Sequence, residues 1–333
     1  MKAVSFGFAV LMMGPAFALA QAGLGSRVSE HHPNIWHRSS PSIDPTRLPL
    51  GDSKYSNAPK KGSIYPCDPK HYFSIPLGSH TKGPWIEGTN WDITRKPVVR
   101  GDVAWPQAKF TVTTNASERI LTGNGLPVGT QTGTFPIRRD DPAFAFDGNP
   151  NPIKERQINV AIPLNPTIAA NASCLQPQIG FTLDGVALHF ALSSMKAHDE
   201  IAYEMQDSCG GMSDPAGIYH RHALSPCIPG INEKNALVGY ALDGFGIFSP
   251  YDASGKELTT NDLDECHGTT SPILWDGKEV TMYHYVFTRD YPYTIGCFRG
   301  TPTYVPLPPP PLGALVMSFI IIAWQNIVAF FSP

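Results

Sequence analysis

The stretch that decides the fold is residues 209–227, CGGMSDPAGIYHRHALSPC, in which two cysteines enclose glycines, prolines and a Tyr-His-Arg-His run. Successive side chains of a β-strand point to opposite faces of a sheet. If this run is a strand, His220 and His222 share one face, and Tyr219 and Arg221 share the other. Two imidazoles on one face are a candidate pair of metal ligands. The alternative is that each histidine is a buried residue satisfied by ordinary hydrogen bonds.

A second, degenerate copy of the pattern lies downstream. It repeats an Asp-Gly pair within an apolar run, an Asp-x-Cys motif, a Tyr-His pair and a closing cysteine. The matched residues are Asp184 and Asp243, Asp207 and Asp264, Tyr219 and Tyr283, and Cys227 and Cys297. This pattern predicts a rough tandem repeat of one structural unit.

The composition is that of a globular protein with many turns. The chain has 333 residues, of which 42% are hydrophobic and 16% are charged, with a net charge of −3. Since there is no long basic run, we expect no nucleic-acid partner. The 33 prolines and 30 glycines favour short strands over long helices.

Five segments alternate or are rich in β-branched and aromatic residues, as strands are. They are residues 109–114, 157–162, 179–192, 236–248 and 280–288. Segments 179–192 and 236–248 are expected to bend into hairpins at Asp184-Gly185 and Asp243-Gly244. The one helical window, 198–206, is short. The predicted fold is mainly β, an antiparallel sandwich or irregular double sheet with a degenerate internal tandem repeat.

The ends of the chain differ from its middle. Residues 1–20 have Lys2, an apolar run and an Ala-Leu-Ala site, which are typical of a signal peptide. Residues 21–62 are predicted to be a flexible arm, 63–300 the β domain and 301–311 a proline-rich spacer. Residues 312–331 carry no charge and are long enough to span a bilayer. Because no Lys or Arg follows, we favour a GPI signal over a single-pass helix, so the protein is expected at the extracellular surface of the membrane.

The cysteines and two sequons fit a secreted protein. Six cysteines are an even set, as in a disulfide framework. The repeat predicts one bridge in each copy, Cys209–Cys227 and Cys266–Cys297, which leaves Cys67 for Cys174. Asn115 and Asn171 begin Asn-Ala-Ser sequons and are the predicted glycosylation sites.

Taken in order, these elements resemble the YHYH-domain proteins, a family named for the motif. The resemblance rests on residues 124–127, 133–136, 184–186, 209–211, 219–222, 224–227, 239–245, 263–266, 283–285, 291–293 and 296–300. It implies the domain but no particular reaction. The sequence departs from the family at three positions: Arg221 replaces a tyrosine, and Met212 and Val286 replace histidines.

The predicted metal site combines both copies. His220 and His222 share a strand face, and His284 is the counterpart of His220, so neighbouring repeat strands would bring three imidazoles together. Such a set suits zinc, copper or iron. Asp243, Asp264 and Glu265 are the candidates for acid–base work or for orienting a ligand, and His267 is a weaker candidate ligand.

Whether the protein is an enzyme is left open by the sequence. It contains no nucleophile elbow, Walker A loop, HExxH motif or dinucleotide fingerprint. The alternative to a metal protein is a non-enzymatic extracellular module that binds carbohydrate or protein. In that alternative, the tyrosines beside the histidines stack on a sugar rather than pack inside the sheet.

Overall fold

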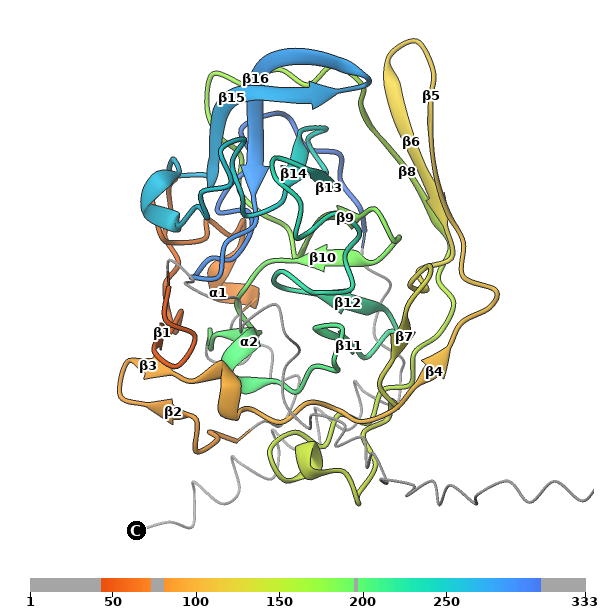
Figure 1. Cartoon of the computed structure of the whole chain (residues 1–333), viewed down its shortest axis with the longest axis vertical. Helices are drawn as coiled ribbons and strands as arrows, with labels where there is room; N and C mark the ends of the chain where they lie inside the picture. The colour runs from red at the N-terminus through yellow and green to blue at the C-terminus, as the bar shows by residue number, and fades with distance from the viewer. Residues whose placement is uncertain (1–42, 73–80, 195–196, 307–333) are drawn as a thin grey trace, which may run out of the picture.

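The computed structural model describes residues 43–72, 81–194 and 197–306, and these form a mainly β protein with several sheets (Figure 1). This confirms the predicted fold class. The expected signal peptide, most of the arm and the apolar segment 312–331 lie outside the described residues. Within the described part of the chain, no helix has the length and apolar character that a bilayer crossing requires.

The centre of the molecule is an eight-stranded sheet. Its order is β11 (Gly211–Ser213), β12 (Tyr219–Arg221), β10 (Ala187–His189), β9 (Gln178–Thr182), β13 (Leu237–Ala241), β14 (Gly246–Phe248), β16 (Lys278–Val286) and β15 (Gly268–Trp275). Neighbouring strands are antiparallel except in the pairs β10–β12 and β14–β16, which are parallel. The sheet is therefore mixed, which the expectation of antiparallel pairing did not include.

Two hairpins form the middle of this sheet, as the sequence predicted. In each, an Asp-Gly pair makes the turn, and the glycines have positive φ, 82° at Gly185 and 90° at Gly244. A glycine has no Cβ, so it adopts this conformation without steric cost. Each hairpin also has one register shift, next to His189 in β9–β10 and next to Leu237 in β13–β14.

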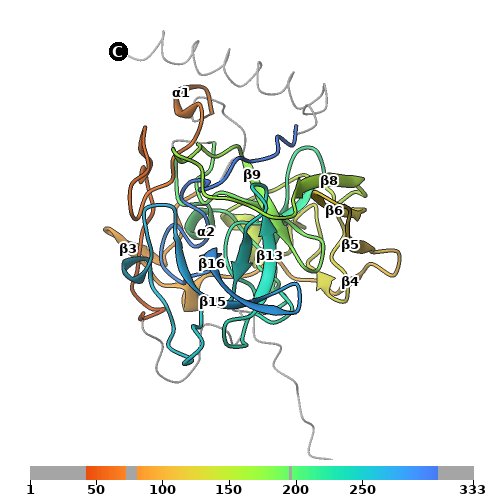
Figure 2. The same ribbon diagram turned by 90° about the horizontal axis from the view of Figure 1, so that it is seen from above.

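A second sheet packs on one face of the central sheet (Figures 1 and 2). It consists of β5 (Phe110–Thr114), β6 (Glu118–Gly123) and β8 (Ile158–Pro163), in the order β5–β6–β8. Phe110 of this sheet contacts Phe181 of β9 with ring centroids 6.3 Å apart. The buried Arg119 of β6 stacks over Tyr240 and Trp275 of the central sheet, at 4.6 and 5.0 Å. The two sheets thus enclose part of the core between them.

Short elements complete the fold. They are β1 (Leu48–Pro49), β2 (Ile86–Glu87) and β3 (Asn90–Trp91) in one small sheet, β4 (Val103–Ala104) with β7 (Gln131–Thr132) in another, the helices α1 (Pro69–Tyr72) and α2 (Glu200–Tyr203), and the 3-10 turns Ile93–Arg95, Pro142–Ala145 and Thr260–Asp262. The predicted helix at 198–206 is reduced to the single turn α2. The described part of the expected arm, residues 43–62, packs on the domain, because Leu48 is fully buried and pairs with Trp91.

The structure contains the two disulfides that the repeat predicted and the third that the remaining cysteines implied. They are Cys67–Cys174, Cys209–Cys227 and Cys266–Cys297. None of the six cysteines is free. Asn115 and Asn171 are both exposed, as a glycan acceptor must be.

Candidate metal centre

Three buried histidines converge on one face of the central sheet. His189 ends β10, His220 is the middle residue of β12, and His222 follows β12 directly. One ring nitrogen of each lies within 4.8 Å of the others. The rings of His189 and His220 stack at 4.3 Å, and the His222 ring lies edge-on to both, at 5.9 and 4.9 Å. We call these residues the histidine cluster.

Strand geometry explains the convergence. In the parallel β10–β12 pair, Ala187 lies opposite His220, so the two side chains share a face. Alternation then places His189 on that face from β10, and His222 on it from the end of β12. The disulfide Cys209–Cys227 closes the loop that carries β11 and β12. The predicted common face of His220 and His222 is therefore present in the structure.

Backbone carbonyls orient two of the rings. The Nδ1 of His222 lies 2.7 Å from the Phe190 carbonyl oxygen, and the Nδ1 of His220 lies 3.1 Å from that of Ile218. A carbonyl only accepts, so each Nδ1 carries the proton and donates it. The Nε2 atoms then keep a lone pair, which is the form in which imidazole binds metal.

Burial lowers the pKa of two residues of the histidine cluster, His189 and His222. The three residues are 3–7% exposed. Burial, followed by the neighbouring His220 and His222, holds the pKa of His189 well below its usual value. Burial and then His220 lower the pKa of His222 to about 3. The Nε2 atoms of His189 and His222 have no hydrogen-bond partner among the described residues. Two buried nitrogens in a neutral, unpartnered state are the donor set that a metal ion would satisfy.

A carboxyl group lies next to the histidine cluster. The Oε1 of Glu200, on α2, is 3.6 Å from the Nε2 of His222. Burial, and then the neighbouring Glu204, raise the pKa of Glu200 well above its usual range. A carboxyl group in this place can complete a coordination sphere or move a proton at an open metal position.

The other residues of the Tyr-His-Arg-His run support the strand from its opposite face. The Tyr219 hydroxyl donates to both carboxylate oxygens of Asp207, at 2.9 and 3.0 Å. The Arg221 Nη1 donates to both oxygens of Asp184, at 2.8 and 3.0 Å, and both side chains of that ion pair are fully buried. Asp184 is thus an ion-pair partner as well as a turn residue.

The structure does not bring His284 to the histidine cluster. His284 lies on β16, and five inter-strand steps separate β16 from β12. At about 4.8 Å a step, the two strands are about 24 Å apart. The ring of His284 instead contacts Phe248 at 4.7 Å, and its Nδ1 lies 3.2 Å from the Met282 carbonyl. The two Tyr-His strands are at opposite ends of the sheet because the hairpins β9–β10 and β13–β14 lie between them.

The carboxylates predicted to orient a ligand also lie away from the histidine cluster, in the part of the molecule that contains β13–β16. Asp243 accepts from the Tyr285 hydroxyl at 2.6 Å, and Asp264 accepts from the Tyr283 hydroxyl at 3.1 Å. Glu265 faces Arg299 at 3.5 Å. The Nε2 of His267 pairs with the Thr288 hydroxyl at 2.9 Å. None of these side chains contacts the histidine cluster; they hold the fold of their own half.

The tyrosines are placed for packing. Tyr219 and Tyr285 are fully buried, and Tyr283 is 4% exposed. Each gives its hydroxyl proton to a carboxylate inside the protein. They do not present faces on which a sugar could stack.

Two site residues, His189 and Glu200, were missed from the sequence. His189 stands alone in an apolar strand, a setting in which a histidine is usually structural. One available signal was its position in the repeat. His189 lies five residues after Asp184, and the residue at the same distance from Asp243 is Phe248, so the two copies differ here. Glu200 has no comparable signal, since it reaches the histidine cluster through a one-turn helix.

Comparison with known protein families finds a match in the middle of the chain. The family model described as YHYH protein matches residues 159–260, which include the whole histidine cluster and Glu200. No curated protein and no solved structure matches the chain.

Proposed function

We propose that this protein, which carries a YHYH domain over residues 159–260, is a secreted metal-binding protein whose metal is held by His189, His220 and His222. The observation that carries the proposal is the set of three buried imidazoles, each with one ring nitrogen within 4.8 Å of the others. Zinc–nitrogen bonds are about 2.0–2.1 Å long, so a tetrahedral ion needs its nitrogens about 3.4 Å apart. Binding of one ion would therefore bring the three rings closer together.

The donor set narrows the metal to ions that accept imidazole. Three nitrogen ligands suit zinc, copper or iron, and they disfavour calcium and magnesium, which prefer oxygen. When bound, such an ion would supply Lewis-acid chemistry at its fourth position. Glu200 is the residue of this chain that would hold or move a proton beside that position.

Two features support an extracellular location. Three disulfides persist in oxidising compartments and are rare in the cytosol. The N-terminal sequence supports export, and the apolar C-terminal segment supports attachment to the outer membrane surface by a GPI anchor. Glycans at the exposed Asn115 and Asn171 belong to the same proposal.

The test is the metal content of the purified protein and of single alanine variants. We expect about one zinc, copper or iron ion per chain, and background metal in H189A, H220A and H222A. H284A is the matched control, because His284 is also a buried histidine in a Tyr-His strand but lies far from the histidine cluster. It should keep its metal.

The fold of each variant is checked by near-ultraviolet circular dichroism and by mapping the three disulfides. Metal content that is unchanged in all three cluster variants, with the fold intact, would overturn the proposal.

A further inference from the structure

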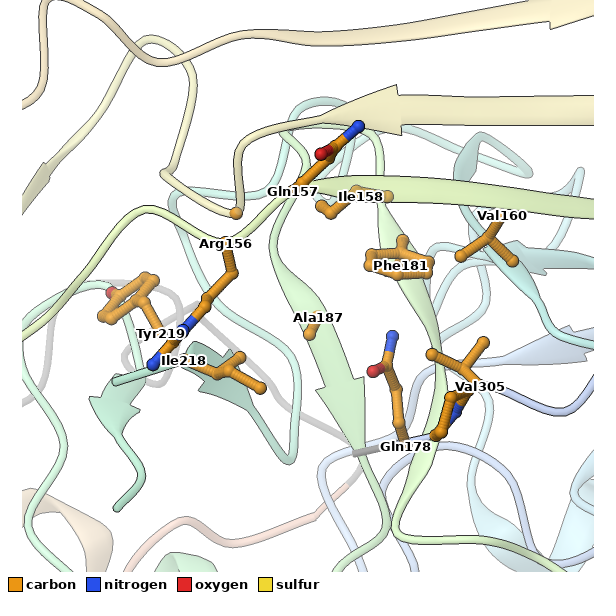
Figure 3. A pocket seen from close by; sticks show the side chains of 12 residues that line it. Arg156, Gln157, Ile158, Val160, Gln178, Phe181, Ala187, Ile218, Tyr219 and Val305 are labelled. Atoms are coloured by element: carbon orange, nitrogen blue, oxygen red, sulfur yellow. The ribbon is translucent and has the colours of Figure 1, made fainter. Parts of the chain in front are cut away.

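A cavity of about 450 Å³ lies between the two sheets. Its walls come from both layers, with Ile158 and Val160 of β8 on one side and Phe181 and Ala187 of the central sheet on the other. Figure 3 shows Arg156 and Tyr219 at one end of the cavity and Gln178 and Val305 at the other. Its volume lies in the range of small-molecule sites.

The strand register connects this cavity to the histidine cluster. Ala187 lies directly opposite His220, and Gln178 lies directly opposite His189. Directly paired residues share a face and have Cβ atoms about 5 Å apart. The register shift next to His189 is what turns Gln178 to the same face as Phe181, three residues further along β9.

Two hydrogen-bond donors in the cavity wall lack partners. Gln178 is 4% exposed, and its Nε2 has no partner in the described structure. Its amide projects between Phe181, Ala187 and Val305 (Figure 3). A buried amide donor without an acceptor is costly, so it indicates a group that the site is built to receive.

The second donor is charged. Arg156 donates from Nη2 to the Ala216 carbonyl, but its buried Nε has no partner. No carboxylate of the described residues forms an ion pair with Arg156. A guanidinium that lines an apolar cavity without a counter-ion favours an anionic ligand, and a planar carboxylate matches the guanidinium geometry.

We propose that this cavity binds a small carboxylate with an apolar body, with the carboxylate on Arg156 and a hydrogen-bond acceptor near Gln178. The apolar walls of Ile158, Phe181 and Ala187 enclose the body. The proposal needs no bound metal, because every group that it uses belongs to the cavity wall.

The experiment measures binding of 3-phenylpropanoate, phenylacetate and octanoate by calorimetry and by ligand-observed NMR, each against its neutral amide. The full protein is used after treatment with a chelator. For each carboxylate with measurable binding, we expect an affinity about tenfold higher than that of its amide. The reason is that the amide cannot form a charge-assisted pair with Arg156.

Variants assign the preference to Arg156. R156M should bind carboxylate and amide equally, and R156K should keep part of the preference, which guards against a folding defect in R156M. Q178L should weaken both ligands about fivefold. R138M is the matched control, because Arg138 is an exposed arginine paired with Asp140, away from the cavity, and it should behave as wild type.

The outcome also separates this proposal from the metal site. H220A should still bind the carboxylates if the cavity acts alone. Failure of every carboxylate to bind at millimolar concentration, or an unchanged preference in R156M, would overturn the cavity proposal and leave the metal proposal standing.

Discussion

The two halves of the central sheet, β9–β12 and β13–β16, have the same arrangement of strands but different side chains at two of the three positions of the histidine cluster. Each half has an antiparallel hairpin, a parallel strand next to it and an antiparallel edge strand. The halves meet at the antiparallel β9–β13 pair. The register agrees as well, because Leu188 lies opposite Arg221 in one half and Ile247 lies opposite Tyr285 in the other.

Contacts inside the halves agree in detail. Tyr219 bonds Asp207 as Tyr283 bonds Asp264, and Cys209 and Cys266 each form a bridge within their own half. The edge strand begins with a glycine in both, where a Cβ would collide with the tyrosine hydroxyl at 2.3 Å in one half and 2.2 Å in the other. Descent of both halves from one duplicated unit stays a prediction from the sequence.

The difference lies where the first half has its histidine cluster. By register, Phe248 occupies the place of His189, and Val286 occupies that of His222, while His284 matches His220. The frame alone therefore makes no metal site. Two side chains decide which half has three converging imidazoles, so the same strand arrangement occurs with and without the histidine cluster.

The first test compares Arg221 and Tyr285, the matching buried residues that follow His220 and His284. Arg221→Met leaves the fully buried Asp184 carboxylate without its counter-charge, which should cost about 3–5 kcal/mol of unfolding free energy. Tyr285→Phe removes a hydroxyl from Asp243, which keeps its bond from the Gly300 amide, so about 1.5–3 kcal/mol is expected. Urea unfolding of the oxidised protein measures both. A Tyr285→Phe cost equal to or above that of Arg221→Met would break this part of the comparison.

The second test is acid stability of the metal-free protein. Burial lowers the pKa of His284 to about 4. Since the unfolded value is about 6.5, the unfolded state binds the proton first, and stability is lost as the pH falls from 6.5 through 4. H284Q cannot take up this proton, so it should retain on the order of 3 kcal/mol relative to wild type at the acid end.

Denaturant titrations over this pH range measure the effect, and the region above pH 6.5 is the internal control, where the H284Q difference should not change with pH. In the metal-loaded protein, acid should also release the ion, because its ligands must be deprotonated. A pH profile of H284Q that parallels wild type throughout would contradict the assignment of this titration to His284.

The third test compares the stabilisation given by the two disulfides Cys209–Cys227 and Cys266–Cys297, and it has the smallest expected difference in unfolding free energy. The bridges close separations of 18 and 31 residues. The chain-entropy model gives about 3 kcal/mol for loops of this size, with about 0.5 kcal/mol more for the longer one. In metal-free protein, replacing Cys266 and Cys297 by serine should therefore cost slightly more than replacing Cys209 and Cys227. Thermal unfolding compares them, and the reverse order would show that the bridges do not act mainly through the unfolded chain.

Local sequence patterns predicted much of the fold. Alternation located β5, β8 and β16, the Asp-Gly pairs located both hairpin turns, and the repeated cysteine pattern predicted the bridges. Strand parity placed His220 and His222 on one face. These features depend on residues close together in the chain, or on the spacing of identical residues.

The remainder of the site depends on the order of strands in the sheet, which local patterns do not contain. His189 joins His220 only because β10 pairs in parallel with β12, across more than thirty residues. The same order keeps His284 away, because four strands stand between β12 and β16. Side-by-side pairing of the two Tyr-His strands was the wrong assumption behind the predicted set of His220, His222 and His284.

Anomalous scattering from crystals of the metal-loaded protein, recorded at the absorption edge of the bound metal, tests the central claim most directly. The account predicts one strong peak, bonded to nitrogens of His189, His220 and His222, and no peak beside His284. A peak at His284, or metal-loaded crystals with no peak at the histidine cluster, would contradict it.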